Sequence, residues 1–332
     1  MGARGLQAIV LALALGAAII SGAAAAPRHF SLGHVLPQKT AYSIAADIFA
    51  GKLAELSSNT LLIDQFPSGQ LGQEEQMLQK IRTGDIDFII VSAANSASVS
   101  PEAGVFSLHY LFRSEEHLRK ALADPEVISA ARGMFDATVK GARVLSLGTQ
   151  GFRDLYGRNE VRRVDDLKGV KIRVQATKTE DTLFPAYGAQ TVHLPFGDVY
   201  TALQTGLVGM AENGINVYLA QKHYEAAPVL SLSEHEANNF VLWASDKVWE
   251  SLSPQEQGWV QAAADEMARS QPEKALALEK EALAKLRKIG VKVVADVDKS
   301  GFMTISQPIQ DQIAAGLGEH AVKILELVRK VP

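Results

Sequence analysis

The stretch Gly84-Asp85-Ile86-Asp87-Phe88-Ile89-Ile90-Val91-Ser92-Ala93-Ala94-Asn95 decides the fold class. Residues 73–82 before it have helical periodicity, which Gly84 ends. The apolar run Ile86–Val91 is long enough for a strand at the centre of a sheet. Ligands in open α/β sheets bind beyond the carboxyl ends of strands, so Ser92 and Asn95 are candidate ligand contacts. An ordinary loop cap is the alternative interpretation.

The same alternation of short β-prone runs and amphipathic stretches continues on both sides of this segment. Strands are predicted at 29–35, 61–66, 86–91, 142–147, 170–174 and 207–211. Helices are predicted at 41–56, 73–82 and 198–205. This order is typical of an α/β protein whose sheets are covered by helices.

A much longer helix is predicted from Ser253 to Ile289. Ser253 is an N-cap residue, Pro254 occupies the first helical position, and Glu256 completes a capping box. Pro272 is expected to bend this helix rather than end it. Such a helix could span two lobes.

The amino terminus has the pattern of a secretory signal peptide. Arg4 precedes an apolar run from Leu6 to Ile20, and small residues follow up to Ala26. We expect cleavage near Ala26 and a periplasmic mature protein; an uncleaved anchor is the alternative. A mature chain of about 300 residues exceeds the usual size of a single core, which favours two lobes.

The composition excludes several classes of function. The chain has no cysteine, which rules out disulfides, thiolate metal sites, a cysteine nucleophile and a lipid-modified cysteine. The net charge is only -4, and no basic stripe with aromatic residues predicts nucleic-acid binding.

Enzyme motifs are also missing from the sequence. No G-x-S-x-G, H-E-x-x-H or P-loop pattern occurs. Glu234-His235-Glu236 lacks the spacing of helical zinc ligands, so His235 is predicted to pack in the fold rather than bind metal. We therefore predict no catalytic residue, no metal site and no cofactor.

Arg173 is the most informative charged residue. It lies in the strand Val170-Lys171-Ile172-Arg173-Val174, where alternation places Lys171 and Arg173 on one face. A half-buried arginine needs an acidic partner, because an unpaired buried charge is costly. That partner could be a ligand carboxylate, which matches the guanidinium fork, or a protein carboxylate such as Asp165 or Asp166.

Four stretches together resemble the substrate-binding proteins of tripartite ATP-independent periplasmic (TRAP) transporters. They are residues 66–72, 151–153, 166–174 and 195–206, and they fall in the family's order along the whole mature chain. The resemblance implies two α/β lobes joined by hinge strands, with a long helix across both and a cleft that closes on one ligand. It assigns residues 27–150 and 239–278 to lobe I, and residues 151–238 and 279–332 to lobe II.

The resemblance also implies a function and a set of ligand-binding residues. The protein would be a monomer that is not an enzyme, binding an organic acid and delivering it to the small and large membrane subunits of a TRAP transporter. Arg173 would pair with the carboxylate. The predicted ligand-binding residues are Arg173, Arg153, Asn213, Phe196, Ser92, Asn95, Glu74, Gln150 and His34.

Two departures from the family pattern limit what can be transferred. Residues 209–214, Gly-Met-Ala-Glu-Asn-Gly, keep the Glu-Asn pair but lose the surrounding aspartate, glutamine and proline. His109 stands where a proline often precedes an aromatic residue. The family's ligand therefore cannot be carried over directly.

The remaining candidate residues favour a hydroxylated ligand. Glu74, Ser92, Asn95 and Gln150 match hydroxyl groups better than a second carboxylate. We expect a sugar acid such as a uronate or aldonate. The alternatives are a C4-dicarboxylate or an oxo acid, and a receptor that feeds a signalling partner instead of a transporter.

Overall fold

The computed structural model describes residues 26–332. The predicted signal peptide falls almost entirely on residues outside this range. Among the described residues, no helix has both the length and the apolar character that a membrane crossing requires.

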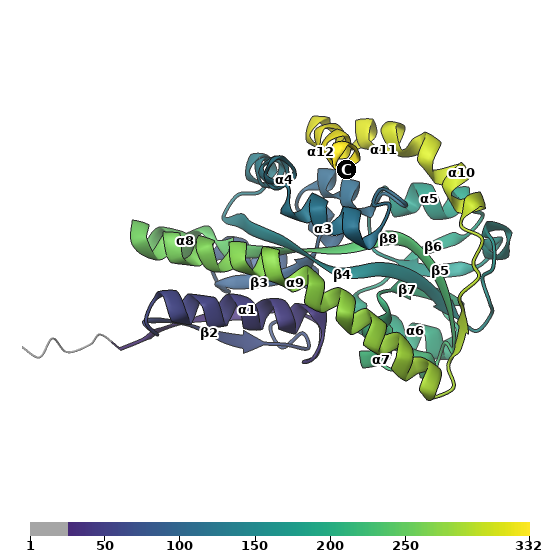
Figure 1. The fold of residues 1–332 in the computed structure, drawn as a ribbon, viewed down its shortest axis with the longest axis horizontal. Helices are drawn as coiled ribbons and strands as arrows, with labels where there is room; N and C mark the ends of the chain where they lie inside the picture. Colours follow the sequence, from purple (N-terminus) through teal and green to yellow (C-terminus); the bar gives the residue numbers. More distant parts are fainter. Residues whose placement is uncertain (1–25) are drawn as a thin grey trace, which may run out of the picture.

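The described chain forms a mixed α/β fold around one nine-stranded sheet (Figure 1). The strand order is β2-β1-β3-β8-β4-β7-β5-β6, and β9 pairs with β8. The strands are β1 (Arg28–Gly33), β2 (Leu61–Phe66), β3 (Phe88–Ser92), β4 (Ala142–Gly157), β5 (Lys171–Val174), β6 (Gln190–His193), β7 (Met210–Asn213), β8 (Val229–Ser245) and β9 (Lys292–Val294).

The long strands β4 and β8 connect the two halves of this sheet. β8 pairs with β3 on one side and with β4 on the other. The β4–β8 register shifts between Thr149 and Phe152, where Gly151 has φ +96°. A side chain is strained in that conformation, so a glycine suits the irregular position. The sequence predicted only residues 142–147 of β4 and did not predict β8.

Helices cover the sheet. They are α1 (Ala41–Leu56), α2 (Glu74–Thr83), α3 (Glu115–Ala123), α4 (Pro125–Thr138), α5 (Glu180–Ala186), α6 (Val199–Thr205), α7 (Ile215–Ala220), α8 (Asp246–Ser251), α9 (Pro254–Lys288), α10 (Ser300–Ser306), α11 (Gln310–Leu317) and α12 (Glu319–Lys330). The main apolar core spans the sheet, and a second cluster includes Tyr156, Leu203, Tyr218 and Leu286.

The predicted long helix is α9, which crosses the molecule diagonally in Figure 1. Its capping box is present, with the Ser253 N–H donating to Glu256 Oε2 at 2.7 Å. Near its middle, the buried Gln271 donates from Nε2 to the Thr149 carbonyl at 2.7 Å. Farther along, the Glu279 carboxylate accepts the backbone N–H groups of Ile215 and Asn216 at 2.6 and 2.9 Å. α9 is thus fixed both to β4 and to α7.

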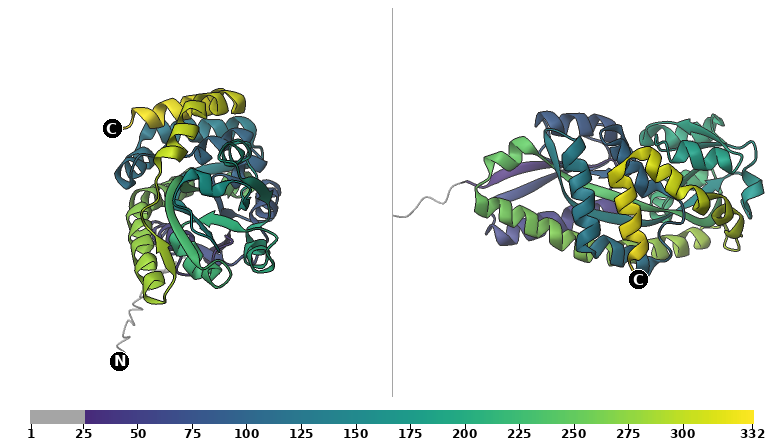
Figure 2. Two further views of the ribbon diagram at one scale, coloured as in Figure 1. Left: turned by 90° about the vertical axis from the view of Figure 1, so that its right-hand side faces the viewer. Right: turned by 90° about the horizontal axis from the view of Figure 1, so that it is seen from above.

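The C-terminal helices contact a segment that is distant in sequence. α11 and α12 pack on the 3-10 helix η2 (Pro101–Ser107), and α12 also packs on α4 (Figure 2). These contacts join residues that the sequence placed in different lobes. The exact lobe boundaries therefore stay a prediction.

Candidate ligand-binding site

A cavity lies where the carboxyl ends of β3 and β5 face each other across β8, β4 and β7. Most of its walls are polar. The lining residues are Val35, Leu36, Tyr42, Glu74, Ser92, Asn95, Gln150, Arg153, Arg173, Gln175, Phe196, Asn213 and Asn238. Eight of the nine predicted ligand-binding residues are in this set, and His34 is the exception.

His34 lies behind the cavity wall. Its side chain is buried, neither ring nitrogen has a hydrogen-bond partner, and the ring packs edge-on against Tyr42 with centroids 6.0 Å apart. Burial lowers the pKa of His34 to about 4, so the ring is neutral near pH 7. The positions that face the cavity are the next ones, Val35 and Leu36. Direct ligand contact by His34 finds no support in this geometry.

Arg173 comes from the carboxyl end of β5. Its Nε and Nη2 donate to the Leu194 carbonyl at 3.1 and 2.7 Å, which fixes one edge of the guanidinium group. Within residues 26–332 it makes no ion pair with an acidic side chain: Asp165 pairs instead with Lys168, and Asp166 with Arg163. Burial lowers the pKa of Arg173, because the charged form loses its hydration.

Arg153, on β4, is held quite differently. It forms an ion pair with Glu212 of β7, in which Nη2 donates to Oε1 at 2.6 Å, and its Nη1 donates to Asn238 Oδ1 at 2.8 Å. Glu236 of β8 lies 3.4 Å from its Nε. Burial alone would lower the pKa of Arg153, but the charge of Glu212 holds it above its usual value. The charge of Arg153 is thus neutralised by the protein itself.

Glu74, the first residue of α2, faces Arg153 and Arg173 from the other wall. Its carboxylate accepts from Asn95 Nδ2 at 2.6 Å, from the Ser92 backbone N–H at 3.2 Å and from the Tyr42 hydroxyl at 3.2 Å. Burial raises the pKa of Glu74 to about 7. The carboxyl can therefore act either as acceptor or as donor toward a ligand near neutral pH.

Amide groups complete the walls. The Gln150 Oε1 atom is buried without a hydrogen-bond partner, and Asn213 Oδ1 accepts from Asn238 Nδ2 at 2.8 Å. Gln175 donates to Ser92 Oγ at 2.8 Å, which joins the end of β5 to the end of β3 across the cavity.

Sequence reasoning missed Tyr42, Gln175, Asn238, Val35 and Leu36. Strand alternation could have found Gln175, because it lies two residues after Arg173. Asn238 could not be found in this way, because β8 itself was not predicted. β7 starts three residues later than predicted and extends to Asn213. Glu212 and Asn213 can lie in a buried strand because both side chains have polar partners inside the protein.

A cleft closed by two α/β halves, lined by arginine, amide and carboxyl groups, defines a solute-binding receptor of the bacterial periplasmic type. The chain belongs to the DctP family, described as bacterial extracellular solute-binding protein family 7, whose model matches residues 32–316. It is a TRAP solute-binding protein, and members of this family are receptors rather than enzymes. The predicted family and fold are confirmed.

Relatives with known names are similar over nearly their whole length. The 2,3-diketo-L-gulonate-binding periplasmic protein YiaO of Escherichia coli (strain K12) is 29% identical over 90% of both chains. The C4-dicarboxylate-binding protein DctB of Bacillus subtilis (strain 168) is 26% identical, over 91% of this chain and 86% of that protein.

Solved structures of sugar-acid complexes superimpose closely. The sugar acid binding protein of Advenella mimigardefordensis in complex with galactonate has a TM-score of 0.86 and 30% identity, covering 92% of this chain and 99% of that chain. The TRAP solute-binding protein of Xanthobacter autotrophicus Py2 with bound β-D-galacturonate has a TM-score of 0.84 and 29% identity, covering 91% and 100%.

Proposed function

We propose that this receptor binds a hydroxylated monocarboxylate, such as a uronate or aldonate, with the carboxylate paired to Arg173. The observation that carries the proposal is the contrast in charge compensation within one cavity. Arg153 is paired with Glu212, whereas within residues 26–332 Arg173 has only the Leu194 backbone carbonyl as its acceptor. A ligand carboxylate would satisfy the free edge of the Arg173 guanidinium group and offset its burial.

The other lining groups support a ligand with hydroxyls rather than a second carboxylate. Their side chains can accept hydrogen bonds, and the amides can also donate them; these residues are Glu74, Asn95, Gln150, Gln175 and Asn213. The relatives that bind galactonate and galacturonate are consistent with this class of ligand.

In this proposal the protein is a periplasmic monomer, exported by its signal peptide, that delivers the acid to the TRAP membrane subunits. A ligand that contacts both walls would favour the closed form, because a closed cleft offers both sets of contacts at once. Closure then removes water from the Arg173–carboxylate pair.

The ligand class can be tested by calorimetry on protein that has been unfolded, dialysed and refolded to remove carried-over solute. Uronates, aldonates, C4-dicarboxylates and oxo acids are titrated separately. We expect heat and thermal stabilisation with uronates or aldonates. Binding of succinate-like acids alone would overturn the sugar-acid proposal.

The carboxylate contact is tested with Arg173→Ala. We expect a loss of about 2–5 kcal/mol of binding free energy, as when one partner of a buried charge pair is truncated. Lys171→Ala is the matched control, because Lys171 is on the same strand but exposed. Equal affinities in the two variants would show that the carboxylate is held elsewhere.

A further inference from the structure

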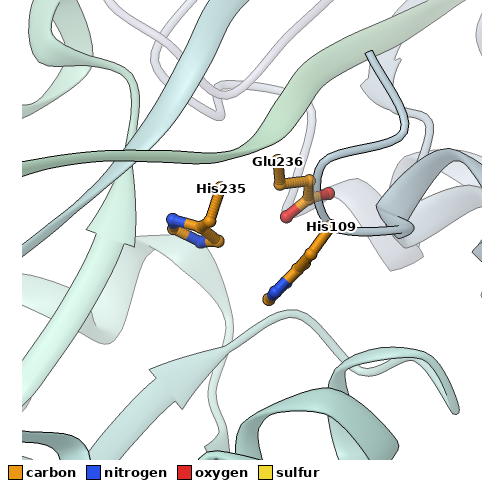
Figure 3. Close-up of side chains that lie close together, drawn as sticks. All are labelled: His109, His235 and Glu236. Atoms are coloured by element: carbon orange, nitrogen blue, oxygen red, sulfur yellow. The ribbon is translucent and has the colours of Figure 1, made fainter. Parts of the chain in front are cut away.

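A buried cluster of histidine and glutamate side chains lies behind the ligand cavity, on the far side of Arg153. His109 comes from the loop after η2, and His235 and Glu236 come from β8 (Figure 3). One ligand-type atom from each of these three residues lies within 4.8 Å of the others. All three side chains are buried.

Both histidine rings are oriented by a hydroxyl group. His109 Nδ1 lies 3.0 Å from the Tyr187 hydroxyl, and His235 Nδ1 lies 2.8 Å from Ser233 Oγ. The opposite nitrogen of each ring, Nε2, is buried and has no hydrogen-bond partner in the described part of the chain. This division of roles is typical of metal-binding histidines, whose second nitrogen is fixed by an outer partner.

The cluster also contains more carboxyl groups than cationic side chains. Glu180 of α5 adds a buried carboxylate whose two oxygens have no hydrogen-bond partner, with Oε2 at 3.4 Å from His109 Nε2. With Glu212 and Glu236 there are three carboxylates, and Arg153 is the cation that lies against them. Ionised carboxylates would leave a net charge of -2, which is costly in a buried site unless it is neutralised.

We propose that this cluster binds one divalent transition-metal ion, of which Zn²⁺ is the representative, through His109 Nε2, His235 Nε2 and the Glu236 carboxylate. Glu180 is positioned to supply a fourth ligand. Two imidazole nitrogens with carboxylate oxygens suit zinc and its neighbours, whereas Ca²⁺ and Mg²⁺ favour all-oxygen sites. A divalent charge balances the -2 of the cluster.

The proposed role of the metal is structural. The ligands come from the loop at His109, from the connecting strand β8 and from α5, so one ion would fix three segments that are far apart in sequence. His235 was predicted to pack in the fold, because Glu234-His235-Glu236 lacks the spacing of helical zinc ligands. In this proposal His235 binds metal together with His109, which is distant in sequence.

Protons are the competing means of neutralising the same charge. Burial raises the pKa values of Glu180 and Glu236 well above their usual range; the charge of Glu212 adds to this effect for Glu180, and the charge of Glu180 adds to it for Glu236. Two protonated carboxyls would remove the charge without a metal. The two possibilities differ in what the purified protein contains.

The test is the metal content of tag-free protein refolded with Zn²⁺ and then freed of loose metal by gel filtration with a mild chelator. We expect one Zn²⁺ per chain, and a higher Tm than for protein refolded with the chelator alone. Refolding with Co²⁺ should give visible absorption bands of a His-ligated ion. These readouts do not depend on ligand binding, so they stand or fall separately from the proposed function.

Two variants and one control locate the site. His109→Gln and His235→Gln should lose the retained Zn²⁺, whereas His29→Gln should keep it, because His29 is exposed and pairs with Asp64 at the surface. If wild-type protein retains no Zn²⁺, Co²⁺, Ni²⁺ or Mn²⁺ after refolding, the metal site is refuted and protons hold the cluster. Retained metal in both cluster variants would refute it equally. Should the variants fail to fold, the wild-type metal content and Co²⁺ spectrum still decide.

Discussion

Arg153 and Arg173 line one cavity, yet the protein compensates their charges differently. Arg153 has a carboxylate partner in Glu212, and a second carboxylate, that of Glu236, nearby. Arg173 donates to a backbone carbonyl and has no acidic partner among the described residues. The first arginine therefore belongs to the folded framework, and the second is available to an external anion. The type of residue is the same, and the neighbours decide its role.

Substitution of Arg153 tests most directly whether this arginine stabilises the fold. Arg153→Ala leaves Glu212 and Glu236 buried without their cation, so we expect the free energy of unfolding to fall by about 3–5 kcal/mol. Urea denaturation followed by circular dichroism measures the loss. Arg173→Ala should cost less than about 1.5 kcal/mol in ligand-free protein, since it removes hydrogen bonds but no ion pair. Equal losses in the two variants would contradict the assignment of roles.

Glu74 offers a second test of how the protein compensates the charge of Arg173, because its charge acts on Arg173. Its pKa in the folded protein is about 7, above the usual 4.5, so the folded state holds the proton more tightly than the unfolded state. Stability from this group is therefore lost as the pH rises from about 4.5 through 7. Relative to Glu74→Gln, the ligand-free wild type should lose on the order of 3 kcal/mol over that range.

The measurement for Glu74 is the difference in unfolding free energy between wild type and variant at several pH values. Taking the difference removes the titration of other groups, which is common to both proteins. A difference that is independent of pH would show that folding does not shift the pKa of Glu74.

The smallest expected effect concerns the contact between the cavity walls. Gln175→Ala removes the hydrogen bond to Ser92 but leaves Arg173 in place. We expect ligand affinity to fall by about 0.5–1.5 kcal/mol, the usual net value of one hydrogen bond. Calorimetry with the ligand found in the screen measures it. A loss as large as that of Arg173→Ala would mean that Gln175 itself binds the carboxylate.

Local patterns were sufficient for part of the fold. The helix at 41–56 and the strand at 61–66 were predicted with the observed bounds, and the capping box placed the start of α9. β4 and β8 were missed in part or entirely, because the polar residues that face the cavity and the buried cluster interrupt their apolar pattern. β1 runs from Arg28 to Gly33, whereas a strand at 29–35 was predicted.

The site was predictable as a set of residues but not as a set of partners. Arg173, Asn95 and Gln150, which were predicted as ligand-binding residues, line one cavity. Nothing in the local sequence links Arg153 to Glu212, which is 59 positions away, or His109 to His235. Such pairs depend on how β4, β7 and β8 are brought together, and that is a property of the whole sheet.

β8 can join the sheet only late in synthesis. β8 separates β3 from β4 in the sheet, although it follows both in the chain. β3 and β4 cannot complete their pairing with β8 until residue 245 has left the ribosome. The backbone N–H groups at the start of α7 gain their acceptor, Glu279, later still. Such distant pairings form slowly. The nine-stranded sheet is therefore completed only after most of the chain has been synthesised.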